Sequence, residues 1–410
     1  MAFKLPNQAD LTIEQTEIIN LPTNKNFVIQ GGPGTGKTVM AIYRAGQMPR
    51  NARVLVLVYN RPLCEFIKTG IKDSDFGAVE VNTLHSWASG FFSNVLGENV
   101  PRNSTDRADY NWNGVHERLI SLGHKFYSHI IIDESQDCPA ALLKGLSAIA
   151  EHITCFIDPN QKVVSDDNSD LMQTLNVLCE PSPYTLTKNF RNTKQIRDAS
   201  VLFWDAKSGT PEPAQAEHDG PKPKMVQCSL RGRGGYNFDN QTTKMVRIIM
   251  NNLDKEIGVL VNPNALNRTK ADLTKALGDA IPVQMFRAMT PNNIDFSVSG
   301  VKILSHGTMK GLEFDMLLVP GLDYANQSIV NQIARGQITY AEAHEICRNR
   351  LYVAMSRPLS ELYIFYFNSG SAMAEWQRPI VAPIFENRNL FDWMIDVPDP
   401  EKQPTLNLFD

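Results

Sequence analysis

The chain has 410 residues, a length that predicts two or three domains. Hydrophobic residues make up 42% and charged residues 20%, a composition typical of an ordinary soluble protein with ample core, and the average share of Gly and Pro excludes a linker or collagen-like chain. The net charge of −4 excludes a polycation, so any surface that binds nucleic acid must be a local basic patch.

Targeting and redox signals are weak throughout the sequence. No apolar run approaches the ~20 residues that a membrane-spanning helix needs, and residues 1–10 lack the apolar stretch of a secretory signal. The six cysteines are scattered without a CxxC pair, which favours a reducing compartment over a disulfide framework or a zinc site. We therefore expect a cytoplasmic protein without a membrane partner.

Short apolar runs alternate with helical patterns in the first half of the chain. The expected strands are Phe27–Gln30, Val54–Tyr59, Ile130–Asp133, Thr154–Asp158 and Tyr184–Thr187, and the expected helices are Thr38–Gln47, Pro62–Thr69 and Ala140–Ala150. Almost continuously apolar strands with helices between them predict a parallel sheet that is covered on both faces.

The same alternation resumes in the second half. The expected strands are Lys224–Cys228, Gly258–Val261, Val283–Phe286, Val301–Ser305 and Met316–Pro320, and the expected helices are Thr242–Leu253 and Asn267–Leu277. We predict an α/β fold with two domains, residues 1–188 and 189–385. Residues 386–410 are expected to form a flexible tail, because their acidic, Pro-rich end cannot build a core.

A phosphate-binding loop follows the first expected strand. Residues 31–38 read GGPGTGKT and open a helix, as the GxxxxGKT pattern of a P-loop requires. Glycines let backbone N–H groups approach phosphates, so Lys37 is predicted to hold the β- and γ-phosphates of ATP and Thr38 to bind Mg²⁺. The other predicted ATP-binding residues of the loop are Gly32, Pro33, Gly34, Thr35 and Gly36. A Gly-rich turn without a ligand is the alternative, and the strand–loop–helix context argues against it.

An acidic pair ends a buried strand in the same domain. Residues 128–137 read SHIIIDESQD, and Asp133 is expected to hold Mg²⁺. Glu134 is expected to orient or deprotonate the attacking water. Together with the P-loop, this pair predicts hydrolysis of an adenine nucleotide.

With DESQD and the segments below, residues 11–366 resemble the UvrD/Rep-type superfamily 1 helicases. The resemblance implies two tandem RecA-like domains with parallel sheets, and an ATP site with Mg²⁺ in the cleft between the domains. Residues 11–15, LTIEQ, are similar to the family's Q motif, which implies that Gln15 reads the adenine edge. The amide of glutamine supplies both the donor and the acceptor that adenine requires.

Two arginines in the second half match further motifs of the family. Leu186–Asn192 is similar to motif IV and Leu351–Arg357 to motif VI, which implies that Arg191 and Arg357 reach the γ-phosphate from the second domain. Planar, permanently charged guanidinium groups suit the charge that spreads over a transferred phosphoryl group. For either arginine alone, a surface ion pair is the alternative.

Two more segments are implied to report the state of the nucleotide. Ile157–Gln161 resembles motif III, in which Gln161 would sense the γ-phosphate. Ser305–Phe314 resembles motif V, in which Glu313 would contact the ribose.

Nucleic-acid contacts are implied by two segments at strand ends. Tyr59–Leu63 lies where motif Ia belongs, and Val81–Trp87 resembles motif Ib. The residues expected to contact nucleic acid are Asn60, Arg61, Thr83, His85 and Trp87. Stacking on a base tolerates any sequence, although Trp87 fits a packed core equally well.

The sequence also departs from the family. Residues 162–167 lack the aromatic residue that follows motif III in the family, and His306 lies one residue before the motif V histidine position, which Gly307 occupies. The intervals between motifs are too short for the two large accessory subdomains of the family. The favoured function is an ATP-dependent translocase or helicase on single-stranded DNA with 3′-to-5′ polarity, acting in DNA repair, replication or phage defence. The alternative is a nucleic-acid-gated ATPase switch or recruitment subunit that does not unwind duplex, and RNA stays open as a partner.

The last residues carry a possible peptide motif. Gln403–Phe409 resembles the short clamp-binding peptides of bacterial replication and repair proteins, which implies a sliding clamp as partner. The alternatives are a chance match and docking of these apolar residues on the protein's own surface. A partner subunit that replaces the missing subdomains is a further expectation.

Overall fold

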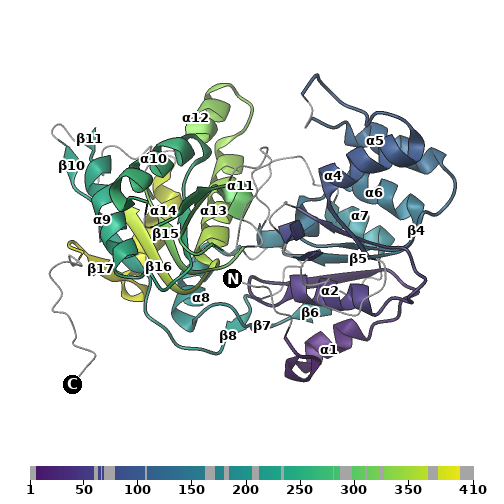
Figure 1. Cartoon of the computed structure of the whole chain (residues 1–410), viewed down its shortest axis with the longest axis horizontal. Helices are drawn as coiled ribbons and strands as arrows, with labels where there is room; N and C mark the ends of the chain where they lie inside the picture. Colours follow the sequence, from purple (N-terminus) through teal and green to yellow (C-terminus); the bar gives the residue numbers. More distant parts are fainter. Residues whose placement is uncertain are drawn as a thin grey trace. The chain divides into compact units, whose positions relative to one another are not determined.

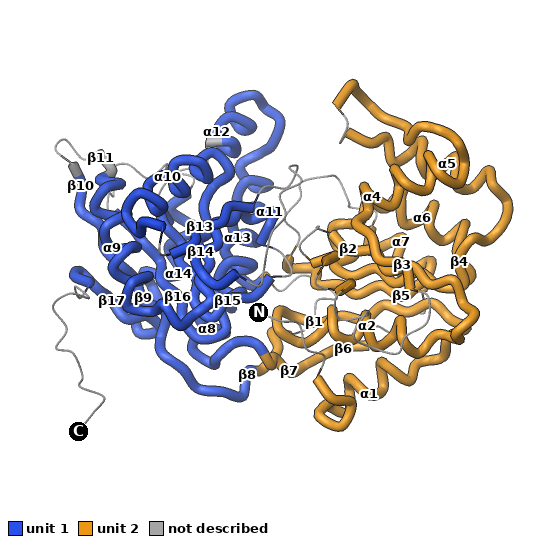
Figure 2. The backbone as a smooth tube through the Cα atoms, viewed as in Figure 1, with its two compact units in different colours: residues 1–2, 191–204, 216–410 blue, residues 3–190, 205–215 orange. Residues whose placement is uncertain are grey.

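A computed structural model describes the chain in two compact units (Figures 1 and 2). Unit 2 comprises residues 3–190 and 205–215, and unit 1 comprises residues 1–2, 191–204 and 216–410. The described residues are 6–59, 63–65, 67–68, 79–106, 109–161, 171–179, 184–205, 212–231, 235–279, 281–286, 298–309, 312–322, 327–367 and 377–397.

Unit 2 is built on a sheet of six parallel strands in the order β3-β2-β4-β5-β1-β6. The strands are β1 (Phe27–Gly31), β2 (Val54–Val58), β3 (Val79–Thr83), β4 (Tyr127–Ile132), β5 (Ala150–Ile157) and β6 (Tyr184–Leu186). The α-helices are α1 (Ile13–Ile19), α2 (Lys37–Gly46), α4 (Leu84–Gly90), α5 (Trp112–Ser121), α6 (Ala140–Ile149) and α7 (Leu171–Leu178). The shorter helical turns are η1 (Gln8–Asp10), η2 (Phe91–Leu96), η3 (Ser135–Asp137) and η4 (Pro159–Gln161).

Alternation along the strands of unit 2 supplies two hydrophobic cores. In β2, Val54, Val56 and Val58 face a core shared with α1 and α2. Leu55 and Leu57 face the opposite core, which α4, α5, α6 and α7 complete. Because successive side chains of a strand point to opposite faces, one fully apolar strand feeds both cores, as the sequence predicts.

Unit 1 contains a second parallel sheet, with seven strands in the order β13-β14-β12-β15-β16-β9-β17. The strands are β9 (Lys224–Gln227), β12 (Ile257–Leu260), β13 (Val283–Met285), β14 (Val301–Leu304), β15 (Phe314–Val319), β16 (Pro358–Tyr366) and β17 (Asp392–Met394). The helices are α8 (Lys194–Val201), α9 (Phe238–Met250), α10 (Leu266–Leu277), α11 (His306–Met309), α12 (Gln327–Ala334), α13 (Tyr340–Met355) and α14 (Arg378–Glu386), with the 3-10 turns η6 (Pro263–Ala265) and η8 (Arg388–Leu390). Two small ladders pair β7 (Lys188–Asn189) with β8 (Gln215–Ala216), and β10 (Leu230–Arg231) with β11 (Gly235–Tyr236).

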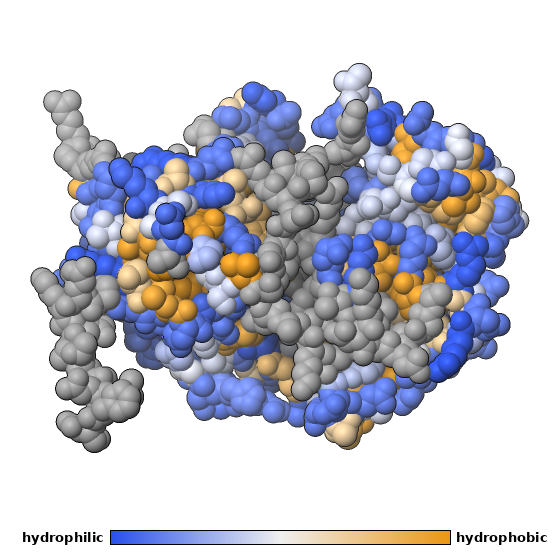
Figure 3. Space-filling model, viewed as in Figure 1, coloured by the Kyte–Doolittle hydropathy of each residue, from blue (hydrophilic) through white to orange (hydrophobic). Residues whose placement is uncertain are grey.

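Helices cover both faces of this sheet as well. One core joins the strands to α8, α13 and α14, and the other joins them to α9 and α10. On the face shown in Figure 3, hydrophilic residues dominate the described surface, and apolar residues gather in separate patches. Two sheets that each bury apolar side chains on both faces confirm the predicted α/β class.

Every strand expected from the apolar runs is present within a few residues of its predicted bounds. The strands β3, β16 and β17 were not expected from those runs. Residues 386–397, which the sequence places in a flexible tail, include β17, and this strand pairs with β9. The pairing has a physical reason, because Phe391 is buried and Trp393 packs against the same core. No helix among the described residues is long and apolar enough to cross a membrane.

Candidate nucleotide site and nucleic-acid contacts

The P-loop in unit 2 joins the end of β1 to the start of α2. Gly34 has φ 73° and Gly36 has φ 85°, both in the left-handed region that L side chains rarely adopt. Gly36 is also the N-cap of α2, so the loop leads directly into a helix N-terminus. This geometry gives phosphate oxygens access to backbone N–H groups and to the positive end of the helix dipole.

Lys37 is held over the loop by its own backbone. Its side chain is 7% exposed, and Nζ donates to the carbonyl of Gly31 at 2.8 Å and to that of Gly32 at 3.1 Å. The Thr35 hydroxyl donates to the same Gly32 carbonyl at 2.9 Å. The ammonium group is thus positioned by hydrogen bonds within the loop.

The start of α1 contacts the P-loop through Gln15. Thr12 and Gln15 form a capping box, in which each side chain accepts from the other residue's backbone N–H. The same Gln15 amide donates to the carbonyl of Thr35 at 3.3 Å. The capping interactions fix the Gln15 side chain beside the loop, where the resemblance places an adenine reader.

The strand β4 brings an acid to the first helical turn of α2. The Thr38 hydroxyl donates to Oδ2 of Asp133 at 2.6 Å, and the backbone N–H of Glu134 donates to Oδ1 at 3.0 Å. Burial raises the pKa of Asp133 to about 6, and the Glu134 carboxylate contributes to the rise, whereas the Thr38 hydrogen bond and Lys37 oppose it. A hydroxyl and a carboxylate in contact are a donor set of hard oxygens that fits Mg²⁺, which needs few protein ligands when phosphates and waters supply the others.

Glu134 has an unusual backbone. Its φ of 53° and ψ of 44° make it the non-glycine residue with positive φ among those that the structure describes. This conformation costs roughly 1–2 kcal/mol for an L residue, and such outliers gather at functional sites. The Asp133 carboxylate accepts the Glu134 N–H and so helps to hold the conformation.

Gln136 links the acidic pair to the end of the neighbouring strand, a link that no sequence motif indicates. Its amide donates to Oε2 of Glu134, and its Oε1 accepts the backbone N–H of Asp158 at 3.0 Å. Asp158 in turn accepts from Nε2 of Gln161 at 2.8 Å. Burial raises the pKa of Asp158. A buried chain of hydrogen bonds therefore connects Glu134 with Gln161, and only the order of strands in the sheet could reveal it.

In unit 1, two predicted ATP contacts are paired with each other. Nε of Arg191 lies 2.7 Å from Oε1 of Glu313, and a second guanidinium nitrogen contacts the same oxygen. The Arg191 side chain is 13% exposed and that of Glu313 is 40% exposed.

Arg357 lies at the junction of α13 and β16 and is 1% exposed. Next to Arg191 in the chain, Asn192 donates to the carbonyl of Ser356 at 3.0 Å and to that of Pro358 at 2.7 Å. The motif IV and motif VI segments are therefore tied together by one buried amide. This second missed residue has no signal in the sequence beyond its place beside Arg191.

The residues predicted to contact nucleic acid have different surroundings. Thr83 caps α4 by accepting from Ser86, and His85 is exposed, with its ring 5.2 Å from that of Tyr110. Trp87 is 1% exposed, and its Nε1 donates to the hydroxyl of Tyr127 at 3.1 Å. This burial favours the core role for Trp87 over stacking on a base. Asn60 and Arg61 lie outside the described residues.

Part of the chain matches a known protein family. Residues 24–204 match the helicase domain of the Schlafen group 3 family, which is described as a DNA/RNA helicase domain. The matched range includes the P-loop, the Asp133–Glu134 pair and Arg191. No curated protein matches the sequence.

Solved helicase structures resemble the chain. Dbp5 from S. cerevisiae, bound to RNA and ADP BeF3, has a TM-score of 0.50 at 11% identity over 94% of each chain. The arterivirus nonstructural protein 10 helicase in complex with DNA has a TM-score of 0.42 at 10% identity, and the match covers 90% of this chain and 65% of the viral protein. The C-terminal domain of a possible DNA helicase from Lactobacillus has a TM-score of 0.32 at 18% identity, covering 50% of this chain and 98% of that domain.

The likeness to Dbp5 concerns the fold, which consists of α/β units similar to RecA-like helicase domains. The UvrD/Rep-type assignment and the roles of individual residues stay predictions from the sequence. The chain thus contains a helicase-like domain at residues 24–204 within an α/β fold of two parallel sheets with six and seven strands.

Proposed function

We propose that this protein is an ATP-dependent motor of superfamily 1, a translocase or helicase on single-stranded nucleic acid that hydrolyses ATP to ADP and phosphate. The main support is the arrangement in unit 2, where Lys37 and Thr38 of the P-loop lie beside each other and Asp133 accepts a hydrogen bond from Thr38. The helicase-like domain that spans these residues supports the proposal.

The proposed chemistry follows from the side chains. Lys37 would neutralise the β- and γ-phosphates, and the backbone of residues 32–36 would donate to their oxygens. Thr38 and Asp133 would hold Mg²⁺, which when bound offsets negative charge on the phosphates. Glu134 would orient the attacking water and accept its proton, and Gln15 would read the adenine edge.

The second set of charges would come from unit 1. Arg191 and Arg357 are proposed to stabilise the charge that develops on the γ-phosphoryl group, with Glu313 near the ribose. Gln161, joined to Glu134 through Asp158 and Gln136, would report the state of the γ-phosphate.

The proposed nucleic-acid contacts are Thr83 at the end of β3, His85 in the first turn of α4, and Asn60 and Arg61, which follow β2 in the sequence. Ligands of parallel sheets bind at the carboxyl ends of the strands, and His85 is exposed there. We propose single-stranded DNA as the substrate strand, with movement in the 3′-to-5′ direction. RNA is tested beside it in the experiment below.

One experiment tests the motor. ATP hydrolysis by the full chain is measured with no nucleic acid, single-stranded DNA, duplex DNA and RNA, beside displacement of streptavidin from either end of a biotinylated strand. We expect hydrolysis stimulated by single strands and displacement from one end. Stimulated hydrolysis without displacement would overturn the motor, and hydrolysis that Lys37→Ala leaves unchanged would overturn the ATP site.

The second candidate is an ATPase switch or recruitment subunit that does not unwind duplex. Among the described residues, the interval between β3 and β4 holds α4, η2 and α5, all packed on the core of unit 2. The interval between Arg191 and Val301 supplies strands of the second sheet. Neither interval forms a separate accessory domain there, which favours a switch or a partner subunit that supplies the missing function.

We propose that such a motor acts in DNA repair, replication or phage defence. The predicted clamp-binding segment Gln403–Phe409 lies outside the described residues. Truncation after Lys402 should preserve ATP hydrolysis and abolish retention on an immobilised bacterial sliding clamp. Equal retention of the truncated chain would rule out the tail as the clamp ligand.

A further inference from the structure

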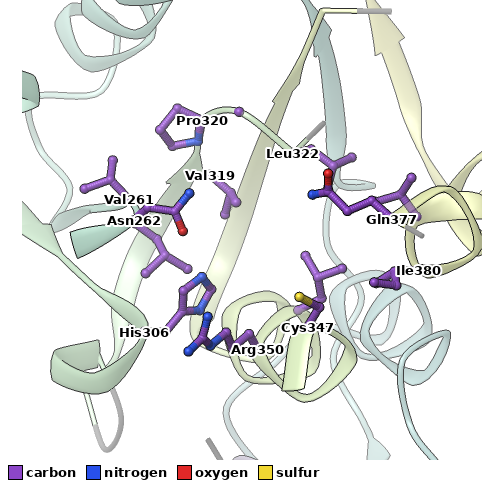
Figure 4. A pocket seen from close by; sticks show the side chains of 14 residues that line it. Val261, Asn262, His306, Val319, Pro320, Leu322, Cys347, Arg350, Gln377 and Ile380 are labelled. Carbon is purple, nitrogen blue, oxygen red and sulfur yellow. The ribbon is translucent and has the colours of Figure 1, made fainter. Parts of the chain in front are cut away.

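A cavity lies at the carboxyl ends of the central strands in unit 1. Residues at and just after the ends of β12 and β15 form one side, and residues of α11, α13 and the start of α14 form the others (Figure 4). In an open parallel sheet, this edge is where ligands bind. None of the residues assigned to the ATP site lines the cavity.

Three polar atoms at this cavity have no hydrogen-bond partner among the residues that the structure describes. They are Nδ1 of His306, Nε of Arg350 and Oε1 of Gln377, and each is buried. Gln377 is 8% exposed, and its amide points into the cavity from the side of α14 (Figure 4). Leaving one such group unsatisfied costs about 1–3 kcal/mol, so three at one cavity indicate groups that a ligand satisfies.

The remaining walls are apolar. Val261, Val319, Leu322 and Ile380 contribute aliphatic side chains. The cavity has a volume of about 90 Å³ and is partly open to solvent. This space is several times what one water needs, and a flat ring can enter edge first with its outer edge in solvent.

The charges narrow the class of ligand. Burial lowers the pKa of His306 to about 3, and the neighbouring Arg350 contributes to the decrease, so the ring is neutral at physiological pH. Arg350 is the cation among the described lining residues, and Gln377 offers an acceptor. An anion would meet this acceptor unfavourably, and a purely apolar group would leave all three polar atoms unsatisfied.

We propose that this cavity binds a single nucleobase. The apolar walls suit the ring faces, Nε of Arg350 suits a ring carbonyl or nitrogen, and Oε1 of Gln377 suits an N–H of the base. His306 supplies a further donor or acceptor, according to its tautomer. The base could be carried by a free nucleoside or by a nucleic-acid strand, and only the strand form rests on the proposed function.

Photocrosslinking locates the base. The full chain is irradiated with free 4-thiouridine or with a short oligothymidylate that carries one 4-thiothymidine, and crosslinked peptides are identified by mass spectrometry. We expect crosslinks within residues 257–262, 304–308, 319–322, 347–351 or 377–381. Labelling by the nucleoside alone assigns a small-molecule site, and labelling by the oligonucleotide alone assigns a strand contact. Crosslinks confined to other peptides would overturn the inference.

A variant tests the polar groups directly. Gln377→Leu keeps the size of the side chain and removes the buried acceptor, so crosslinking at the cavity should need about tenfold more probe. The variant should unfold at the same or a higher temperature than the parent, because an unsatisfied acceptor is removed. Gln337→Leu, which changes an exposed glutamine after α12, is the matched control. Crosslinking unchanged by Gln377→Leu would contradict the site, and His306→Phe provides a second test.

The failure of this inference can be told from that of the proposed function. The probes need no ATP, so cavity crosslinks could appear in a chain without ATPase activity, and then only the proposed motor would fail. Lys37-dependent ATP hydrolysis without cavity crosslinks would overturn the base site alone.

Discussion

Arg191 and Glu313 form an ion pair within unit 1, in which two guanidinium nitrogens contact one carboxylate oxygen. The sequence resemblance assigns the arginine to the γ-phosphate and the glutamate to the ribose. In the structure, these two predicted ATP contacts bind each other instead. Because Glu313 is 40% exposed, the pair contributes at most about 1 kcal/mol. A phosphate group is able to compete for the arginine at that strength.

Glu313→Gln tests whether this pair restrains hydrolysis. Removing the charge weakens the contact between Glu313 and Arg191, so ATP turnover without nucleic acid should rise by about two- to fivefold. Steady-state rates with and without single-stranded DNA provide the measurement. Glu98→Gln is the matched control, because Glu98 pairs with Arg118 on the surface of unit 2. A higher KM for ATP at an unchanged basal rate would show instead that Glu313 only binds the nucleotide.

Lys37→Ala should abolish ATP hydrolysis, because the phosphates lose the buried counter-charge that Gly31 and Gly32 hold in place. Turnover is measured with saturating single-stranded DNA. Lys275→Ala, which changes an exposed lysine of α10, should hydrolyse ATP at the parent rate. Equal activity of both variants would place the ATP site elsewhere.

Gln136→Ala breaks the connection between Glu134 and Asp158. We expect kcat for ATP to fall roughly tenfold or more while KM changes less than about twofold, since Gln136 positions the water-activating carboxylate without touching the nucleotide. Gln173→Ala, at an exposed position of α7, controls for the loss of a glutamine. If KM rises in parallel, or if thermal unfolding shows that the variant is not folded, Gln136 has a structural role instead.

His129 should make folding sensitive to acid. Its Nε2 lies 2.8 Å from the Thr154 hydroxyl, and burial, with smaller effects of Arg44 and His152, lowers its pKa to about 3. Between about 6.5 and 3, the unfolded chain binds a proton that the folded chain excludes, so stability falls as the pH falls through this window. Between pH 7 and pH 5, protonation of His129 in the unfolded chain should lower the free energy of unfolding by about 2 kcal/mol. The His129→Gln variant should not show this part of the decrease. Urea titrations of both proteins measure the difference, and identical losses would assign the acid sensitivity to other groups.

The strands could be predicted wherever a run was apolar throughout, as in β2 and β4. The strand β3, with sequence VEVNT, was missed because it is a half-buried edge strand that mixes polar and apolar residues. The sequence does not predict β17, because a segment of three residues forms a strand only when it can pair with the edge of an existing sheet, here with β9. Pairing between distant segments, not local propensity, creates such strands.

The sequence by itself determined three features: the P-loop, the acidic pair Asp133–Glu134 at the end of a strand, and the alternation of strands and helices in each half of the chain. These features follow from glycine conformations and apolar periodicity, which are local properties of the chain. Tertiary structure alone decided that Gln136 bridges Glu134 and Asp158, that Asn192 ties motif IV to motif VI, and that His306 turns toward Arg350 in a cavity. Each of these contacts joins segments that are distant in the sequence, and the long crossovers between parallel strands leave their neighbours undetermined until the sheet forms.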